Sequence, residues 1–114
     1  MKKIRKYQHI LIEFLQVYAK YKPVNLPNTE NKIIIDKVKR QYLMMRVGWK
    51  ETRFVHDLVF HFEINENGKV LIFANWTDVD ITEDWILQGM LKSDIVLAFQ
   101  PEYLRENTGF AVVA

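Results

Sequence analysis

The dipeptide Asn67-Gly68 constrains the fold more than any other feature of the sequence, because it separates two stretches rich in β-branched and aromatic residues, 53–64 and 69–76. Asn-Gly favours a type I′ turn, in which both central residues need a positive φ, and such a turn joins two antiparallel strands. A turn of fixed length also fixes which residues face each other across the hairpin. The predicted pairs are Ile64–Leu71, Phe62–Phe73, His61–Ala74 and Val59–Trp76.

A second turn, at residues 50–53, pairs the strand at 53–64 with another β-forming stretch at 41–49. Its predicted pairs are Trp49–Phe54, Val47–His56, Arg46–Asp57, Met45–Leu58 and Leu43–Phe60. The two registers agree, and together they place one set of apolar side chains on the same face of the sheet. We expect the first helix to cover this face and form the core with it. The face carries Leu43, Met45, Val47, Trp49, Phe54, Leu58, Phe60, Phe62, Ile64, Leu71 and Phe73.

Apolar residues at helical spacing predict a helix over residues 3–21, which Pro23 prevents from continuing. A further strand is predicted at 32–37, a second helix at 81–91 with Asp80 as its N-cap, and a short buried strand at 95–99. At 114 residues the chain is long enough for one core and too short for two. The sequence therefore predicts a single α+β domain of residues 1–114: an N-terminal helix packed on a four-stranded antiparallel meander, followed by a second helix and a short C-terminal strand.

The opposite face of the predicted sheet is half apolar, which is too apolar for open solvent and too polar for a simple core. We expect the second helix, the C-terminal segment or another subunit to cover it. The candidate partner-interface residues are Met44, Val59, His61, Ile72 and Trp76 on this face, with Gln100, Pro101 and Phe110 in the C-terminal segment.

Charge is distributed unevenly along the chain. Residues 1–53 hold 13 Lys and Arg against 4 Asp and Glu, whereas residues 54–114 hold 3 against 10. The two signs can simply solvate two exposed surfaces, or the basic half can steer an anionic partner such as DNA. The candidate nucleic-acid residues are Lys2, Lys3, Arg5, Lys6, Lys37, Lys39 and Arg40.

Catalytic and metal-binding patterns are absent from the sequence. There is no cysteine, which excludes disulfides and thiolate chemistry and suits the cytoplasm. His56 and His61 are five residues apart on one predicted strand, so alternation should send them to opposite faces. No apolar stretch reaches the length of a membrane span, and the acidic residues between 78 and 84 suit the start of a helix. We therefore expect no catalytic residue, no metal, no cofactor and no membrane contact.

Several short segments, in this order and spacing, resemble the XisI family of fdxN element excision controlling factors. The segments are Tyr18-Ala19-Lys20-Tyr21-Lys22-Pro23, Val47-Gly48-Trp49, His61-Phe62-Glu63-Ile64, Asp94-Ile95-Val96-Leu97 and Thr108-Gly109-Phe110-Ala111-Val112. The resemblance covers nearly the whole chain. The chain departs from the family pattern at Gly89-Met90-Leu91-Lys92, and at Gln100, where a histidine is usual in relatives.

The resemblance implies a non-catalytic accessory protein that acts with an XisH-like partner in the site-specific excision of a DNA element in cyanobacteria. The leading hypothesis is thus a module that binds another protein. A homodimer could cover the same half-apolar face. Direct DNA binding through the basic N-terminal half is the alternative.

Overall fold

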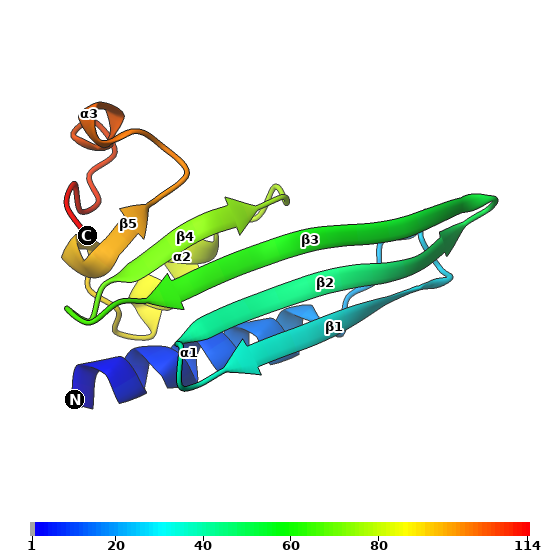
Figure 1. The fold of residues 1–114 in the computed structure, drawn as a ribbon, viewed down its shortest axis with the longest axis horizontal. Helices are drawn as coiled ribbons and strands as arrows, with labels where there is room; N and C mark the ends of the chain where they lie inside the picture. Colours follow the sequence, from blue (N-terminus) through cyan, green and yellow to red (C-terminus); the bar gives the residue numbers. More distant parts are fainter. Residues whose placement is uncertain (1) are drawn as a thin grey trace.

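A five-stranded sheet in the order β1-β2-β3-β4-β5 is the framework of the computed structural model, which describes residues 2–114 (Figure 1). Neighbouring strands are antiparallel except β4 and β5, which are parallel. The predicted α+β order of helix, meander, helix and short strand is confirmed. The elements are α1 (Lys2–Tyr18), β1 (Thr29–Asp36), β2 (Gln41–Lys50), β3 (Arg53–Ile64), β4 (Val70–Asn75), α2 (Ile81–Leu87), a 3₁₀ turn η1 (Lys92–Asp94), β5 (Ile95–Leu97) and α3 (Glu102–Arg105).

Helices α1 and α2 cover one face of the sheet, called the inner face below (Figure 1). Helix α1 buries the stripe that its sequence predicts, and Phe14 on this stripe packs edge-on against Phe60 and Trp85. Asp80 caps α2 as predicted, because its carboxylate accepts the backbone N–H groups of Thr82 and Glu83. The sheet contributes Tyr42, Met44, Val59, Phe60, Phe62, Ile64, Val70, Ile72 and Ile95 to this core.

The β2–β3 register follows the prediction in one half and departs from it in the other. Arg46 faces Asp57 and Trp49 faces Phe54, as predicted. The register then shifts between Met44 and Met45, so that Met44 faces Phe60 and Val59 is the extra residue of a β-bulge.

The turn between β3 and β4 is longer than the predicted type I′ turn. Asn65 N–H donates to Lys69 O at 2.9 Å, and Gly68 N–H donates to Asn65 O at 3.0 Å. Gly68 has a φ of 75°, whereas Asn67 is not among the residues with positive φ in the described chain. This is the three-residue hairpin loop in which a type I turn precedes a glycine in the left-handed region.

The longer turn moves the neighbouring pairs by one residue, so Ile64 faces Val70 and Phe62 faces Ile72. A second bulge, between His61 and Phe62, restores the predicted pair of His61 and Ala74. Because side chains alternate along a strand, each shift of one residue exchanges the two faces.

The predicted assignment of the faces was therefore wrong for most of the sheet. Met44, Val59 and Ile72, which were expected on the second face, lie in the core under the helices. Phe60, Phe62 and Ile64 are in the core as expected. The other residues expected beneath α1 are only half-buried or exposed and lie on the opposite face: Leu43, Met45, Val47, Trp49, Phe54, Leu58, Leu71 and Phe73.

Residues 45–58 of β2 and β3, with the start of β1, form an arm that extends past the end of α1 (Figure 1). The loop before β1 supports the inner side of this arm. Arg46 Nε donates to Asn31 Oδ1 at 3.1 Å, and Asn31 Nδ2 donates to Tyr21 O at 2.7 Å. A Cβ on Gly48 would stand 2.3 Å from Asn28 O, so only glycine permits this approach.

A buried polar contact ties the first turns of α1 to the chain just before β5. Tyr7 Oη donates to Asp94 Oδ2 at 2.5 Å and accepts the Leu91 N–H at 3.2 Å, while Lys3 Nζ donates to Asp94 Oδ1 at 3.0 Å. Burial, with a smaller contribution from the hydrogen bond to Asp94, raises the pKa of Tyr7 to about 12.

We expect Tyr7→Phe to lower the free energy of unfolding by about 1–2 kcal/mol, because it removes a buried hydrogen bond and leaves the Asp94 carboxylate less well satisfied. The raised pKa means that the unfolded chain loses the phenolic proton first. The stabilisation from Tyr7 is therefore complete below pH 10 and is lost as the pH rises toward 12. Urea unfolding of both proteins across this range should show a shallower alkaline loss for Tyr7→Phe. Tyr103→Phe, at an exposed position, is the control; equal slopes for wild type and Tyr7→Phe would contradict the assignment.

Candidate interaction surface

The sheet face opposite α1 and α2, called the outer face below, carries a continuous apolar surface. Its most exposed apolar side chains are Phe54 at 52%, Trp49 at 50%, Ile34 at 49% and Phe73 at 38%. Trp49 and Phe54 face each other across the arm, with ring centroids 5.1 Å apart. Half-buried residues continue this surface toward the base of the sheet: Leu43, Met45, Val47, Leu58 and Leu71.

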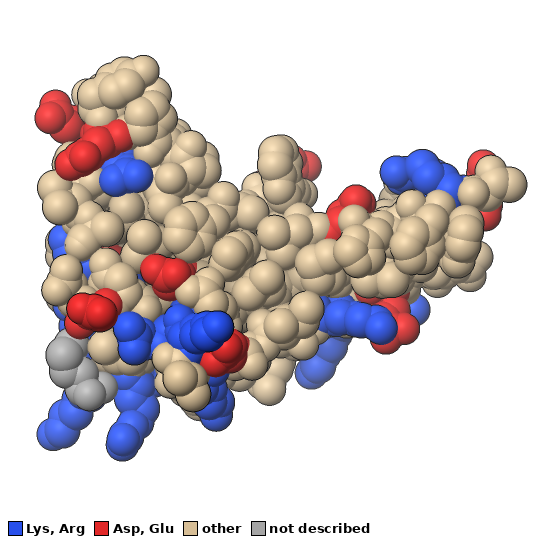
Figure 2. Space-filling view, viewed as in Figure 1, with Lys and Arg blue, Asp and Glu red and all other residues tan. Residues whose placement is uncertain are grey.

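Within residues 2–114, no element packs over the middle of the outer face (Figure 1). The C-terminal segment lies against β5 instead, where Ala111 N–H donates to Ile95 O at 2.8 Å. Figure 2 shows that the middle of this side of the molecule is largely free of charged side chains. Monomeric proteins rarely leave a large apolar surface open to solvent, which makes the outer face the candidate interaction surface.

His61 is the centre of a polar group on the outer face, at the base of the arm. Its Nε2 is 2.7 Å from Gln41 Oε1, and Gln41 Nε2 donates to Glu63 Oε1. Because the Gln41 carbonyl oxygen only accepts, this arrangement requires the proton of His61 on Nε2. Burial lowers the pKa of His61, against the opposing effect of Glu63, and the ring packs 4.9 Å from that of Phe73. His61 is therefore mainly neutral at pH 7.

The prediction that His56 and His61 lie on opposite faces of the sheet was wrong, because the bulge between them changes the alternation. His56 faces Val47 and His61 faces Leu43, so both histidines lie on the outer face. No group of three His, Asp or Glu side chains in the described chain is arranged to hold a metal ion.

The predicted interface residues do not form one site. Met44, Val59 and Ile72 belong to the core and present no surface to a partner. Trp76 is 79% exposed and directly follows β4. Its backbone N–H donates to Val59 O. His61 is on the outer face.

The C-terminal candidates lie at the far edge of the sheet, away from the arm. Gln100 O accepts from Arg105 Nε at 3.0 Å, and Pro101 precedes α3. Phe110 is half-buried against the core with Lys92 Nζ over its ring. The outer-face aromatics Trp49, Phe54 and Phe73 were missed because the sequence assigned them to the core.

Three of the seven predicted nucleic-acid residues are engaged within the chain. Lys3 binds Asp94, Lys6 Nζ donates to Gly89 O at 3.2 Å, and Arg40 Nε donates to Ile64 O at 2.8 Å. The other four, Lys2, Arg5, Lys37 and Lys39, are exposed. At the end of the molecule where α1 begins, Figure 2 shows Lys and Arg side chains with Asp and Glu side chains among them.

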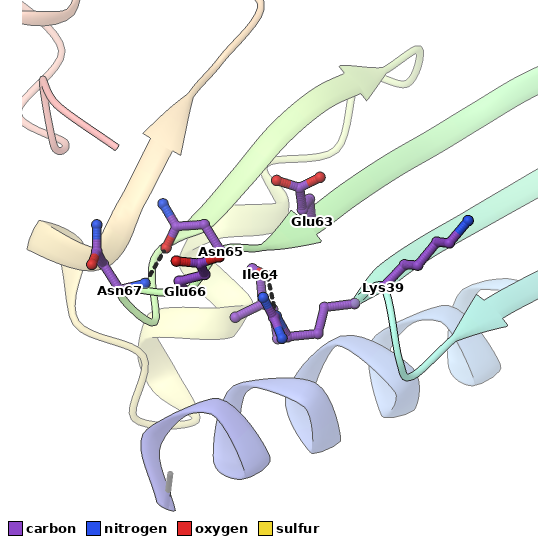
Figure 3. Close-up of a pocket in the computed structure, with 7 residues that line it drawn as sticks. Lys39, Glu63, Ile64, Asn65, Glu66 and Asn67 are labelled. Atoms are coloured by element: carbon purple, nitrogen blue, oxygen red, sulfur yellow. Dashed lines mark hydrogen bonds between the residues drawn. The ribbon is translucent and has the colours of Figure 1, made fainter.

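A hollow between the β1–β2 and β3–β4 turns has lining residues of both charges (Figure 3). Lys39 stands on one side of it, and Glu63 and Glu66 on the other. The mixture of signs gives this hollow no preference for an anion.

None of the helices in residues 2–114 is long and apolar enough to cross a membrane.

Three comparisons relate the chain to known proteins. A family model described as "XisI protein" matches residues 1–112. A crystal structure of an XisI-like protein from Anabaena variabilis ATCC 29413 superposes with a TM-score of 0.85 at 32% identity, covering 96% of this chain and 99% of that one. The fdxN element excision controlling factor XisI from the same strain superposes with a TM-score of 0.81 at 28% identity, covering 97% and 99%. No curated protein matches the chain.

The contact between His61 and Phe73 generates a prediction. We expect NMR titration to give His61 a pKa below 6.5, and Phe73→Ala to bring that pKa closer to 6.5, because the variant exposes the imidazole to water. With a depressed folded-state pKa, the stabilisation from neutral His61 is present above pH 6.5 and is lost as the pH falls through the folded pKa. An unchanged pKa in Phe73→Ala would show that Phe73 does not desolvate the ring; Phe99→Ala, a half-exposed aromatic after β5, is the matched control.

Proposed function

The chain belongs to the XisI family, and we propose that this excision controlling factor acts by binding a protein partner through its outer face and catalyses no reaction itself. The open apolar surface around Trp49 and Phe54 is the observation that carries the proposal. The two rings lie on the paired strands β2 and β3 and face each other across them.

The proposed partner is an XisH-like protein, and the surface has the composition of a protein interface. Aromatic residues dominate the strongly binding positions of such interfaces, and a polar rim surrounds them. Here Trp49 and Phe54 provide two adjacent rings, and the aliphatic residues beside them can exclude water. Polar residues border this surface: Glu30, Lys32, Gln41, His56 and Glu63.

The polar group around His61 supports a binding role over a catalytic one. Gln41 is bonded to both His61 and Glu63, and Phe73 packs on the imidazole. A general base must instead reach the proton of a substrate or nucleophile. We assign this group to the rim of the interface, where it can discriminate between partners through hydrogen bonds.

In this proposal the DNA element is reached through the complex. Direct DNA binding by the free chain would depend on Lys2, Arg5, Lys37 and Lys39, since the other basic candidates are engaged within the chain.

We expect Trp49→Lys and Phe54→Lys each to weaken binding to an XisH-like protein at least about 30-fold, the effect of losing an interface residue worth about 2 kcal/mol. Both side chains are half-exposed, so the variants should keep the fold, which circular dichroism would verify. Isothermal titration calorimetry gives the affinities. Val24→Lys, at a 98% exposed apolar position in the loop before β1, introduces the same charge away from the surface and should bind as wild type.

Folded variants that bind the partner as wild type would overturn the proposal. So would an isolated chain that binds duplex DNA with a steep salt dependence and loses that binding when Lys2 and Arg5 are replaced by glutamine, because direct DNA binding would then be the function.

A further inference from the structure

Within residues 2–114, no strand pairs with the edge of β1 that points away from β2. β1 pairs only with β2, and in the described chain no backbone hydrogen bond reaches residues 30–36 from any other element. The opposite edge of the sheet is β5, which has only three residues, and the C-terminal segment already donates a hydrogen bond to Ile95 there. An open edge offers a row of N–H and C=O groups to another strand.

β1 lacks most of the features that keep an edge strand from pairing. It has eight residues, no proline and no bulge in its register with β2. Its middle is Ile33, Ile34 and Ile35, and Ile34 is 49% exposed. Lys32 and Asp36 are the charges that flank this run, and an edge lysine usually opposes pairing. In β1, however, the three isoleucines have Lys32 at one end and Asp36 at the other, so the two flanking charges have opposite signs.

We propose that β1 pairs with β1 of a second copy of this chain, antiparallel and centred on Ile34. In this register Lys32 lies opposite Asp36 of the second copy at both ends, and Ile33 lies opposite Ile35. Opposite charges in directly facing positions stabilise a sheet, and β-branched pairs add packing.

Charge selects this register among its neighbours. Centring the pair on Lys32 sets the two lysines against each other, and centring it on Ile33 sets Glu30 against Asp36. Centring it on Asn31 pairs Glu30 with Lys32 but leaves the isoleucines beyond Ile33 without a strand opposite them, because the partner strand begins at Thr29. Of these registers, only the one centred on Ile34 satisfies both the charges and the apolar centre.

The resulting dimer is one ten-stranded sheet, five strands from each copy. Directly opposed residues share a face, so the two outer faces lie on the same side, and the antiparallel strands point the two arms in opposite directions. This dimer forms through the strand edge and leaves the rings of Trp49 and Phe54 free, although it shares Lys32 with the border of the aromatic surface.

Charge reversal tests the pairing. We expect sedimentation equilibrium to show a dimer for the wild type and a dissociation constant raised at least about tenfold for Lys32→Glu, since each dimer then holds two like-charge pairs. Asp36→Lys should have the same effect. A mixture of the two variants should form a heterodimer, because each substituted residue then faces a residue of opposite charge in the other variant, and the two unsubstituted residues also pair.

The controls separate this effect from damage to the fold. Asp36 Oδ1 accepts the N–H groups of Val38 and Lys39 at 3.0 Å each, so Asp36→Asn, which keeps an acceptor for them, removes the charge of Asp36 while leaving the turn intact. If Asp36→Lys does not fold, the comparison of Lys32→Glu with Lys32→Arg decides, since Lys32→Arg should remain a dimer. Lys22→Glu makes the same charge change at an exposed position outside the strand.

Three results would overturn the proposal: a wild type that is monomeric at every concentration, a dimer that Lys32→Glu leaves unchanged, or folded single variants that fail to associate when mixed. A dimer disrupted by Phe54→Lys and not by Lys32→Glu would place the contact on the outer face instead.

Discussion

β3 carries one residue more than β2 along the length over which the two strands pair. The bulge absorbs this residue, so Val59 and Phe60 follow each other in the chain yet are both buried toward the helices. Beyond the bulge, β3 sends Phe62 and Ile64 into the core and turns His61 and Glu63 away from it. Without the bulge, strict alternation would place the histidine and the carboxylate beneath α1, where desolvation would be costly. The aromatic contacts of Phe14 and Trp85 with the sheet depend on this exchange.

The sequence predicted every main element of the fold, and the arm half of the β2–β3 register, because these depend on periodicity and on turns close in the chain. It did not predict the faces, since a bulge depends on packing between distant elements. The sequence does contain one local signal for the longer turn, which is Asn65. Asn65 Oδ1 accepts the N–H groups of Asn67 and Lys69 at 3.0 Å each, and asparagine is favoured at the first position of a type I turn. The Asn-Gly pair fits both turn types, and Asn65 decides between them.

The candidate site was predicted in part. A half-apolar second face, covered by another element or subunit, was expected. The sheet does have an apolar face outside its core, but residues that were expected in the core form it, and three of the residues expected on it lie in the core. Trp49, Phe54 and Phe73 look like core residues in any composition-based reasoning, because large aromatic side chains are usually buried. Only their position relative to the bulges reveals that they are open. The outer face begins on β1, where Lys32 and Ile34 border Met45 and Leu43, so the aromatic surface and the open edge are contiguous.

Because of the position of the β2–β3 bulge, the length of the arm can differ without changing the core, whereas the length of the base of the sheet cannot. Pairing in the arm is set by the turn at residues 50–53, and pairing at the base is set by the core, with the bulge as the boundary between them. Adding or removing two residues in each arm strand would preserve alternation on both sides of this boundary. The reach of the molecule can thus change without repacking its interior, provided that Gly48 keeps its place against the supporting loop. The length of the arm is in this sense independent of the packing at the base.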